Sequence, residues 1–244
     1  MPRGWWADTP ARLAVVLGVT GGFAFLGYRV HGVTRAGASA GAVVCLVLLA
    51  SVGPGAFLTL FTLFAVTWIA TRLGRARKQR LGTAERREGR SASQVFANLG
   101  VAAAAALLYS LRNDALFAAA MVAALSEAAS DTVSSEMGQA CSDQARLITT
   151  FQPVPAGTDG GITWCGTLAG VLAAFGIGLT AALVGVVPSG QIWIIGSAGT
   201  LGMLADSYLG AWLERRGRLR NDTVNFLSTW VAALVASAAI NLVR

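Results

Sequence analysis

The sequence contains a single histidine, His31, and only three cysteines, Cys45, Cys141 and Cys165. The cysteines stand in unrelated contexts, with no C-x-x-C pair among them and no histidine close by. A zinc site, a dithiol redox centre or a histidine-based catalytic triad is therefore not expected.

Charged residues are also scarce: Asp, Glu, Lys and Arg make up 13% of the 244 residues, while 55% are hydrophobic and the mean hydropathy is +0.60. Several apolar runs approach the ~20 residues that a helix needs to cross a ~30 Å hydrocarbon core. We expect one integral-membrane domain over residues 1–244, an all-α polytopic helix bundle. No small-residue cleavage site follows the first run, so we expect a retained span rather than a signal peptide.

Marking off the apolar runs gives eight predicted spans. The second and third are short and are separated only by the turn-like "SVGPG", so a hairpin or one re-entrant pair, with seven spans in all, stays an alternative. Most of the 29 glycines indicate close packing between transmembrane helices. The predicted spans are residues 11–30, 36–52, 55–72, 94–112, 115–138, 161–188, 190–213 and 223–243.

Basic residues are distributed unevenly over the connecting loops. If the basic loop 72–93 is cytoplasmic, eight spans place 29–35, 139–160 and 214–222 on the same side. Fifteen of the 19 Lys and Arg residues then lie in the cytoplasm, as the positive-inside rule predicts. We expect a multi-pass cell-membrane protein with both termini outside, whose net charge of +7 reflects topology and contact with anionic lipids rather than nucleic-acid binding. The basic residues left outside are Arg3, Arg12, Arg112 and Arg244.

The stretch "SEAASDTVSSEMG", residues 126–138, places three acids at the end of an apolar run. At about 1.5 Å per helical residue, Asp131 lies about 10 Å and Glu127 about 16 Å inside the cytoplasmic end of the fifth span. These two share a helix face, whereas Glu136 points elsewhere. Asp206 in the seventh span lies as deep as Asp131. Because ionisable groups inside a membrane usually face the bundle interior, we predict one site near the cytoplasmic face.

Amide side chains fall in the same layer, at Gln94, Asn98 and Asn225. Carboxylates combined with amide oxygens suit Mg²⁺, which is usually held by one or two carboxylates, water and substrate phosphates. We therefore predict Mg²⁺ as the cofactor, bound by Asp131 and Asp206. Glu127 and Glu136 are further candidate ligands.

The loop "TTFQPVPAGTDGGITWCG" is rich in small residues at the mouth of the sixth span. Backbone N–H groups and a helix N-terminus there can bind an anion. The loop lacks the G-K-[ST] ending of a P-loop, so by itself it indicates a turn as much as a phosphate site. Nearby cations make the phosphate site the better interpretation, although a solvated positive-inside loop stays open. The candidate loop residues are Gly157, Thr158, Gly160 and Gly161, and the cations are Arg72, Lys78, Arg90 and Arg146.

Six motifs, spread in order over about residues 15–240, resemble the integral-membrane family formerly known as domain of unknown function ninety-two, which includes a plant plastid phytyl-phosphate kinase. The motifs are "TRLGRARKQRLG", "GRSASQVFANLG", "SEAASDTVSSEMG", "LITTFQPVPAGTDGGITWCGTLAG", "ADSYLGAWLE" and "NDTVNFLST".

The resemblance implies a kinase that moves a phosphoryl group from a nucleoside triphosphate, CTP in the plant branch, to a prenyl monophosphate of the phytyl, farnesyl or geranylgeranyl type. The family's patterns match Asp131 and Glu136, the glycine loop from Pro155 to Gly161, and Asp206 with Ser207 and Gly210. The implied catalytic residues are Asp131, Asp206, Lys78 and Arg90, with the nucleotide near Arg72 and the loop. The prenyl tail would lie in a groove between the fifth, sixth and seventh spans.

Two other functions stay open at this point. A cytidylyltransferase-like enzyme would use the same metal and loop to attach CMP to a lipid phosphate and release pyrophosphate. An ion- or proton-coupled transporter would also carry buried acids on facing helices. The acids lie in one half of the membrane and no inverted repeat is visible, which favours an enzyme.

Overall fold

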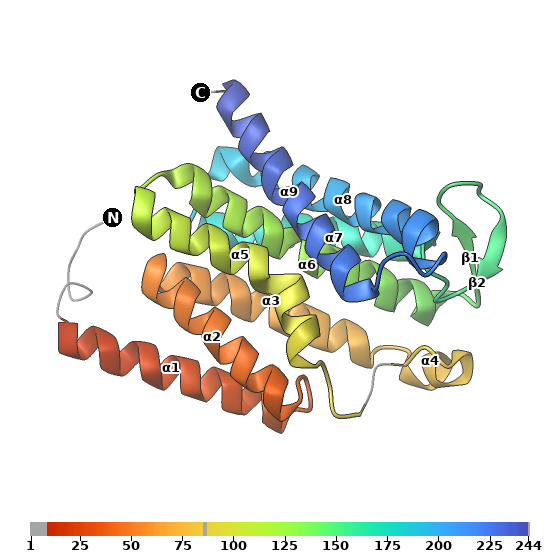
Figure 1. Ribbon diagram of the computed structural model, residues 1–244, viewed down its shortest axis with the longest axis horizontal. Helices are drawn as coiled ribbons and strands as arrows, with labels where there is room; N and C mark the ends of the chain where they lie inside the picture. The colour runs from red at the N-terminus through yellow and green to blue at the C-terminus, as the bar shows by residue number, and fades with distance from the viewer. Residues whose placement is uncertain (1–8, 85–86, 244) are drawn as a thin grey trace.

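The computed structural model describes residues 9–84 and 87–243, and over these it is an all-α polytopic bundle with a small sheet at one end (Figure 1). Arg3, Arg244 and part of the basic loop 72–93 lie outside the described residues. The elements in chain order are α1 (Thr9–Arg29), α2 (Arg35–Ser51), α3 (Pro54–Arg72), α4 (Arg75–Leu81), α5 (Ala92–Arg112), α6 (Ala115–Cys141), β1 (Gln144–Leu147), β2 (Pro153–Pro155), β3 (Gly161–Ile162), α7 (Trp164–Leu183), η2 (Ser189–Gln191), α8 (Ile192–Leu209), η3 (Gly210–Glu214) and α9 (Asn221–Val243).

Each of the eight predicted spans corresponds to one long helix in the described residues, so eight separate helices replace the alternative of a re-entrant pair. Six of them, α1, α3, α5, α6, α7 and α9, are long and apolar enough to cross a membrane by length and composition. Helix α2 is shorter at 17 residues. Helix α8 has 18 residues, and Asp206 lies in its last turn.

Helix α6 forms the centre of the bundle. Of its most apolar stretch, 83% is buried inside the protein, against 17–39% for the other five candidate spans. Small residues of its neighbours allow this close packing: a Cβ on Gly166 of α7 would lie 2.4 Å from the Ser134 carbonyl oxygen, and one on Gly202 of α8 would lie 2.5 Å from Cγ of Glu127. Small residues therefore let α7 and α8 approach α6 closely, as in other membrane bundles.

The polar segments gather at one end of the bundle, which we call the sheet end. Figure 1 shows α4, β1 and β2 at this end, opposite the first turn of α1 and the last turn of α9. The strand order is β2-β1-β3, with both pairs antiparallel. The sheet moves the start of the sixth span from the predicted residue 161 to Trp164. It occupies the predicted loop 139–160, whose first residues belong instead to α6.

A disulfide joins two of the cysteines that looked unrelated in the sequence. Cys141 ends α6, Cys165 lies in the first turn of α7, and their Cα atoms are 6.6 Å apart. The antiparallel packing of these two helices brings the residues together, although 24 positions separate them in sequence. Cys45 is free and buried.

Candidate active site

A polar cavity of about 720 Å³, counting space open to solvent, lies at the sheet end between α6, α8, η3 and the glycine loop. We call it the acidic cavity, because four carboxylates line it from four different segments: Asp131, Asp159, Asp206 and Glu214. Its other lining residues include Ser134, Ser135, Gln139, Ser207, Asn221 and the whole segment from Ala156 to Thr163.

None of these four carboxylates forms an ion pair within the described residues. The salt bridges found there are Arg77–Asp143, at 3.0 Å, and Lys78–Glu136, at 2.5 Å. Asp206 instead accepts a hydrogen bond from Ser228 Oγ of α9, at 3.2 Å. Negative charge is therefore concentrated in this cavity without a basic partner in direct contact.

Buried oxygen atoms without donors surround the same region. Among the described residues, the buried side-chain atoms that lack a hydrogen-bond partner are Glu127 Oε1, Gln139 Oε1 and Asn225 Oδ1, and all three are acceptors. Gln139 lines the acidic cavity, whereas Glu127 lies one helical turn deeper than Asp131 and is 1% exposed. Buried acceptors of this kind normally have a partner, so a bound cation or donor would complete the site.

The residues present fit a magnesium ion. The donors are carboxylate, amide and hydroxyl oxygens with no histidine or cysteine thiolate, the set that hard cations prefer. No group of three or more His, Cys, Asp or Glu side chains is arranged as a ready metal cage in the described chain. An incomplete protein shell is expected for Mg²⁺, which is usually held by one or two carboxylates and completed by water and phosphates.

Two of the four acids lie outside the membrane-spanning segments, and their pKa values are displaced upward. Burial raises the pKa of Asp159, and the nearby Arg215 partly offsets this. Burial, followed by the negative charges of Asp159, Asp131 and Asp222, raises the pKa of Glu214 to about 7. Like charges crowded into a low-dielectric space have this effect.

The glycine loop forms one wall of the acidic cavity. Gly157 and Gly160 have φ angles of +85° and +74°, which side chains rarely adopt. A Cβ on Gly160 would also lie 2.7 Å from the Ser207 carbonyl oxygen, so the loop packs directly on the end of α8. The amide of Gly161 donates to the Thr158 carbonyl oxygen at 2.8 Å and is therefore engaged within the turn.

A second cavity, of about 1100 Å³ counting space open to solvent, lies between α1, α2, α3 and α5. Its deep part is apolar, and its sheet-end mouth carries three arginines. We call it the amphipathic groove. Its apolar lining includes Phe23, Leu60, Leu63, Phe64, Trp68, Val95 and Leu99, and its polar lining His31, Arg72, Arg75, Arg90, Gln94 and Asn98.

This cavity does not lie between the fifth, sixth and seventh spans, where a tail-binding groove was predicted. Those spans are α6, α7 and α8, and their glycines let them pack too closely to leave such a space. A Cβ on Gly170 of α7, for example, would lie 2.5 Å from Met203 Sδ and 2.8 Å from Ser134 Cβ.

Arg90 links the amphipathic groove to α6 beside Asp131. Its side chain lines the amphipathic groove, and its Nη2 donates to Thr132 Oγ1 at 3.3 Å, beside Asp131 on α6. The backbone holds it there, because the Arg90 amide donates to Gly32 and its carbonyl accepts from Thr34. Arg90 is also the cation whose charge acts on the Asp131 carboxyl group.

Arg72 belongs to the groove rather than to the acidic cavity. Its guanidinium lies 3.8 Å from the centre of the Trp68 ring and donates to the Val30 carbonyl oxygen at 2.5 Å. Gln94 and Asn98 also line the groove; the side chain of Gln94 completes the capping box of α5 with Ser91.

The structure does not bring Lys78 and Glu136 to either cavity. Lys78 is 1% exposed, and its ammonium group donates to Glu136, to the Ala70 carbonyl and to the Thr71 carbonyl, at 2.5, 3.1 and 2.8 Å. An ammonium has three hydrogens, so these acceptors use all of them. Lys78 therefore holds α4 against α3 and α6, and we leave both residues out of the site.

Two lining acids were not among the predicted site residues. Asp159 lies inside the glycine motif, and Glu214 follows Asp206 by eight residues, close to two helical turns. That spacing would have indicated Glu214, because the helix continues through η3 and keeps both acids on one side. Asn225 and Glu127 lie behind the cavity lining rather than in it.

The fold and these cavities define the class of protein: it is a multi-pass helical membrane protein whose polar residues converge at one end. The chain belongs to the family described as integral membrane protein DUF92, whose family model matches residues 18–233. No solved structure matches this chain.

Relatives of this chain occur in archaea, cyanobacteria and plants. An uncharacterized membrane protein of Methanocaldococcus jannaschii is 48% identical over 117 residues, which cover 47% of this chain and 48% of that protein. An uncharacterized membrane protein of Synechocystis is 33% identical over 199 residues, covering 80% of this chain and 77% of the other. Protein VTE6, chloroplastic, of Arabidopsis thaliana is 29% identical over 216 residues, covering 85% of this chain and 65% of VTE6.

Proposed function

We propose that this protein is a membrane-embedded kinase that transfers a phosphoryl group from a nucleoside triphosphate, with CTP as the expected donor, to a prenyl monophosphate. The observation that carries the proposal is the pair of cavities of opposite character, one with Arg90 in its lining and the other with Asp131, joined by the hydrogen bond from Arg90 to Thr132. One is acidic and walled by a glycine loop, which suits a magnesium nucleotide. The other is apolar with an arginine mouth, which suits a lipid phosphate.

In this proposal the acidic cavity holds the donor. Asp131 and Asp206 would hold Mg²⁺, with Asp159 and Glu214 close by, and the glycine loop would border the phosphates. When bound, the ion neutralises charge on the triphosphate, which is its usual contribution to phosphoryl transfer. The unpaired Gln139 oxygen in the cavity lining supports this assignment, as does the lack of an ion pair for any of the four acids within the described residues.

The amphipathic groove holds the acceptor. Arg72 and Arg90, and with them Arg75 and His31, bind the monophosphate at the mouth, while the prenyl tail lies among the apolar side chains. Arg72 and Arg90 are therefore assigned to the acceptor, whereas the sequence placed them near the nucleotide. Guanidinium groups suit this role, because their planar donors match phosphate oxygens.

The reaction needs positioning and charge neutralisation more than proton transfer. An oxygen of the acceptor monophosphate attacks the γ-phosphorus, the bond from that phosphorus to the β,γ-bridging oxygen breaks, and the nucleoside diphosphate leaves. A phosphate monoester has a second pKa of about 6 and is already ionised near neutral pH, so no strong base is required. Arg90 lies where the two phosphates would approach and stabilises their combined negative charge.

The proposed orientation places the sheet end in the cytoplasm and both termini outside. The sheet end carries the basic loop, and the positive-inside rule supports a cytoplasmic position for it. Soluble nucleotides would then enter the acidic cavity from the cytoplasm, while the acceptor enters the groove from the surrounding membrane lipids.

A product assay with two labels tests the proposal. Purified protein in detergent is incubated with Mg²⁺, prenyl monophosphates and CTP or ATP labelled at either the α- or the γ-phosphate. We expect the γ-label, and not the α-label, in a prenyl diphosphate. Transfer of the α-label with release of pyrophosphate would identify a cytidylyltransferase instead, and no transfer of either label would contradict both enzymes.

A further inference from the structure

We infer that Phe23 closes the deep end of the amphipathic groove and limits the length of the prenyl tail that the protein accepts. This inference rests on the proposed function for the identity of the ligand. The groove itself, its arginine mouth and its aromatic end are properties of the structure alone.

Phe23 stands at the centre of an aromatic cluster. Its ring lies 5.6 Å from that of Phe57, 6.3 Å from Phe61 and 5.4 Å from Phe64, measured between centroids, and the Phe57 and Phe64 contacts are edge-to-face. Phe23 and Phe64 line the groove, whereas Phe57 and Phe61 contact Phe23 from outside the lining. Such ring contacts hold a side chain in place more firmly than aliphatic contacts of similar area.

The charged mouth explains why a tail with an anionic head would fill this groove. The arginines at the mouth bind a phosphate, and the apolar side chains below them face the part of the ligand that cannot enter water. A phosphate fixed at Arg72 and Arg90 sets the starting point of the tail. The distance from there to Phe23 then sets the length that fits.

The helix geometry gives that distance. Among the groove-lining residues of α3, Leu60 lies farthest from Arg72, and its neighbour Phe61 contacts Phe23. Leu60 precedes Arg72 by twelve residues, or about 18 Å of helix. The Arg72 guanidinium folds back over Trp68, which is eight residues from Leu60, or about 12 Å. An extended chain advances about 1.2 Å per bond, so an isoprene unit with four backbone bonds spans about 5 Å. About three isoprene units therefore fit above Phe23.

Substitutions at two positions, with opposite effects, can test the depth of the groove. Phe23→Ala removes the barrier and lengthens the groove, and Phe23→Leu does so partly while preserving more of the packing. Gly41→Leu has the reverse effect: Gly41 lines the groove, and a Cβ there would meet nothing within 4 Å, so a larger side chain enters the groove without a clash.

Matched controls come from the same helix as Phe23. Phe25, two residues away, is 65% exposed and does not line the groove, so Phe25→Ala removes the same ring without changing groove depth. Gly18 also has open space at its Cβ position but lies outside the groove lining, which makes Gly18→Leu the control for Gly41→Leu.

The experiment measures both binding and turnover with geranyl, farnesyl, geranylgeranyl and longer prenyl monophosphates. Binding is read from the ligand-induced rise of the thermal unfolding midpoint, and turnover from kcat/KM. In the wild type we expect farnesyl monophosphate, whose tail has three isoprene units, to bind best. Steric selection by one side chain is typically worth about tenfold or more, so the Phe23 variants should shift the preference toward longer tails by about that factor. Gly41→Leu should shift it toward geranyl.

An unchanged order of preference in both Phe23 variants and in Gly41→Leu would overturn the inference. The outcome for the proposed function is separate. If the wild type binds prenyl monophosphates with this length dependence but transfers no phosphoryl group, the kinase proposal fails and the groove assignment stands. If the wild type transfers the phosphoryl group but no variant alters the length preference, the kinase proposal stands and the role of Phe23 is contradicted.

Discussion

Asp131 on α6 and Asp206 on α8 bring two acid side chains to one cavity from helices that are far apart in sequence. Each is partly buried and lines the acidic cavity, and neither is in an ion pair within the described residues. A carboxylate that is partly withdrawn from water and has no cationic partner is costly, so such residues usually serve a bound ligand.

Replacing either aspartate by asparagine should therefore remove activity and leave the fold intact. We expect Asp131→Asn and Asp206→Asn to lower kcat by at least about 10²–10³-fold, the usual cost of losing one preorganised electrostatic group. The thermal midpoint without Mg²⁺ should stay the same or rise, because repulsion among the acids is relieved. Asp143→Asn, in the half-exposed pair with Arg77, is the control, and full activity in either cavity variant would remove that residue from the site.

Lys78 should behave as a structural residue. Breaking its buried pair with Glu136 leaves an uncompensated charge, so Lys78→Met should destabilise the protein by about 3–5 kcal/mol. The double change Lys78→Met with Glu136→Leu should recover much of that loss. Substitution of the more exposed Arg77 should cost only about 0–1 kcal/mol. A raised KM for nucleotide with unchanged stability in Lys78→Met would instead return Lys78 to the site.

Residue positions within a predicted helix could be placed from sequence, because depth follows from counting along the helix. This is how Asp131 and Asp206 could be put at one level. The pairing of Lys78 with Glu136 could not be predicted, since the two residues are 58 positions apart and meet only because α4 docks beside α6. Phe23 was missed for the same reason: its contacts come from α3.

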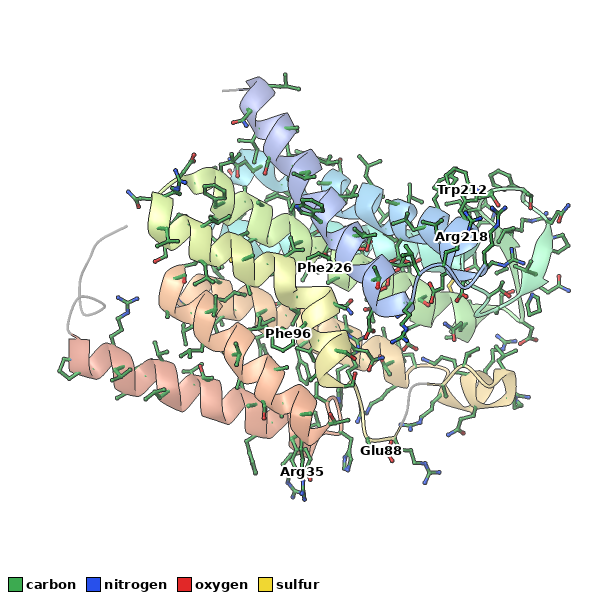
Figure 2. All side chains as sticks on the ribbon, viewed as in Figure 1. Arg35, Glu88, Phe96, Trp212, Arg218 and Phe226 are labelled. Atoms are coloured by element: carbon green, nitrogen blue, oxygen red, sulfur yellow. A yellow bond between two sulfur atoms is a disulfide. The ribbon has the colours of Figure 1, made fainter. Side chains whose placement is uncertain are left out.

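At the scale of elements, the acidic cavity depends on short segments that follow the long helices. The three-stranded sheet carries the glycine loop, and η3 continues α8 as a π-helix that ends at Glu214. Figure 2 shows Trp212 and Arg218 near these segments at the sheet end. Hydrophobic runs predicted the long helices well, but a seven-residue helix, a sheet of two- to four-residue strands and a π-helix leave no such pattern in the sequence.

The crowding of acids around η3 predicts that the stability of the folded protein depends on pH. The pKa of Glu214 is raised from 4.5 to about 7, so its neutral form stabilises the folded state at low pH. This contribution is fully present below 4.5 and is lost as the pH rises through about 7. Without divalent cations, the thermal midpoint should therefore fall over this interval, and Mg²⁺ should reduce the fall. Glu214→Gln should flatten the profile; a midpoint that rises with pH and is unaffected by this substitution would contradict the assignment.

At the scale of the whole molecule, the two cavities lie in different parts of the bundle. Helices α1, α2, α3 and α5 surround the amphipathic groove, while α6, α8, η3 and the sheet surround the acidic cavity. The two cavities open toward the same end, where Arg90 reaches from the groove to α6. The eight-helix arrangement could be predicted from hydropathy, but the location of the groove could not, because it depends on which helices pack closely and which leave a gap.

The proposed orientation can be tested by labelling single introduced cysteines in sealed vesicles. The introduced cysteines are placed in a background in which Cys141 and Cys165 are replaced by serine, and Cys45 is buried and should not react with a membrane-impermeant maleimide. Glu88→Cys and Arg218→Cys, at the sheet end, should be labelled only from the cytoplasmic side (Figure 2). Asn113→Cys and Ser189→Cys should be labelled only from outside. Labelling of Glu88 and Arg218 from opposite sides would place the basic loop and the acidic cavity apart and contradict the topology.

The most direct test of the two-site account is a comparison of the KM values for the two substrates in Arg72→Gln and Asp206→Asn. Arg72 lies in the groove, so its loss should raise KM for prenyl monophosphate by about tenfold or more and leave KM for nucleotide unchanged. Asp206→Asn should weaken magnesium-nucleotide binding, measured directly where turnover is too low, and leave prenyl monophosphate binding unchanged. Arg77→Gln should alter neither. If Arg72→Gln instead raises KM for nucleotide as much as KM for the lipid, the two cavities are not separate substrate sites.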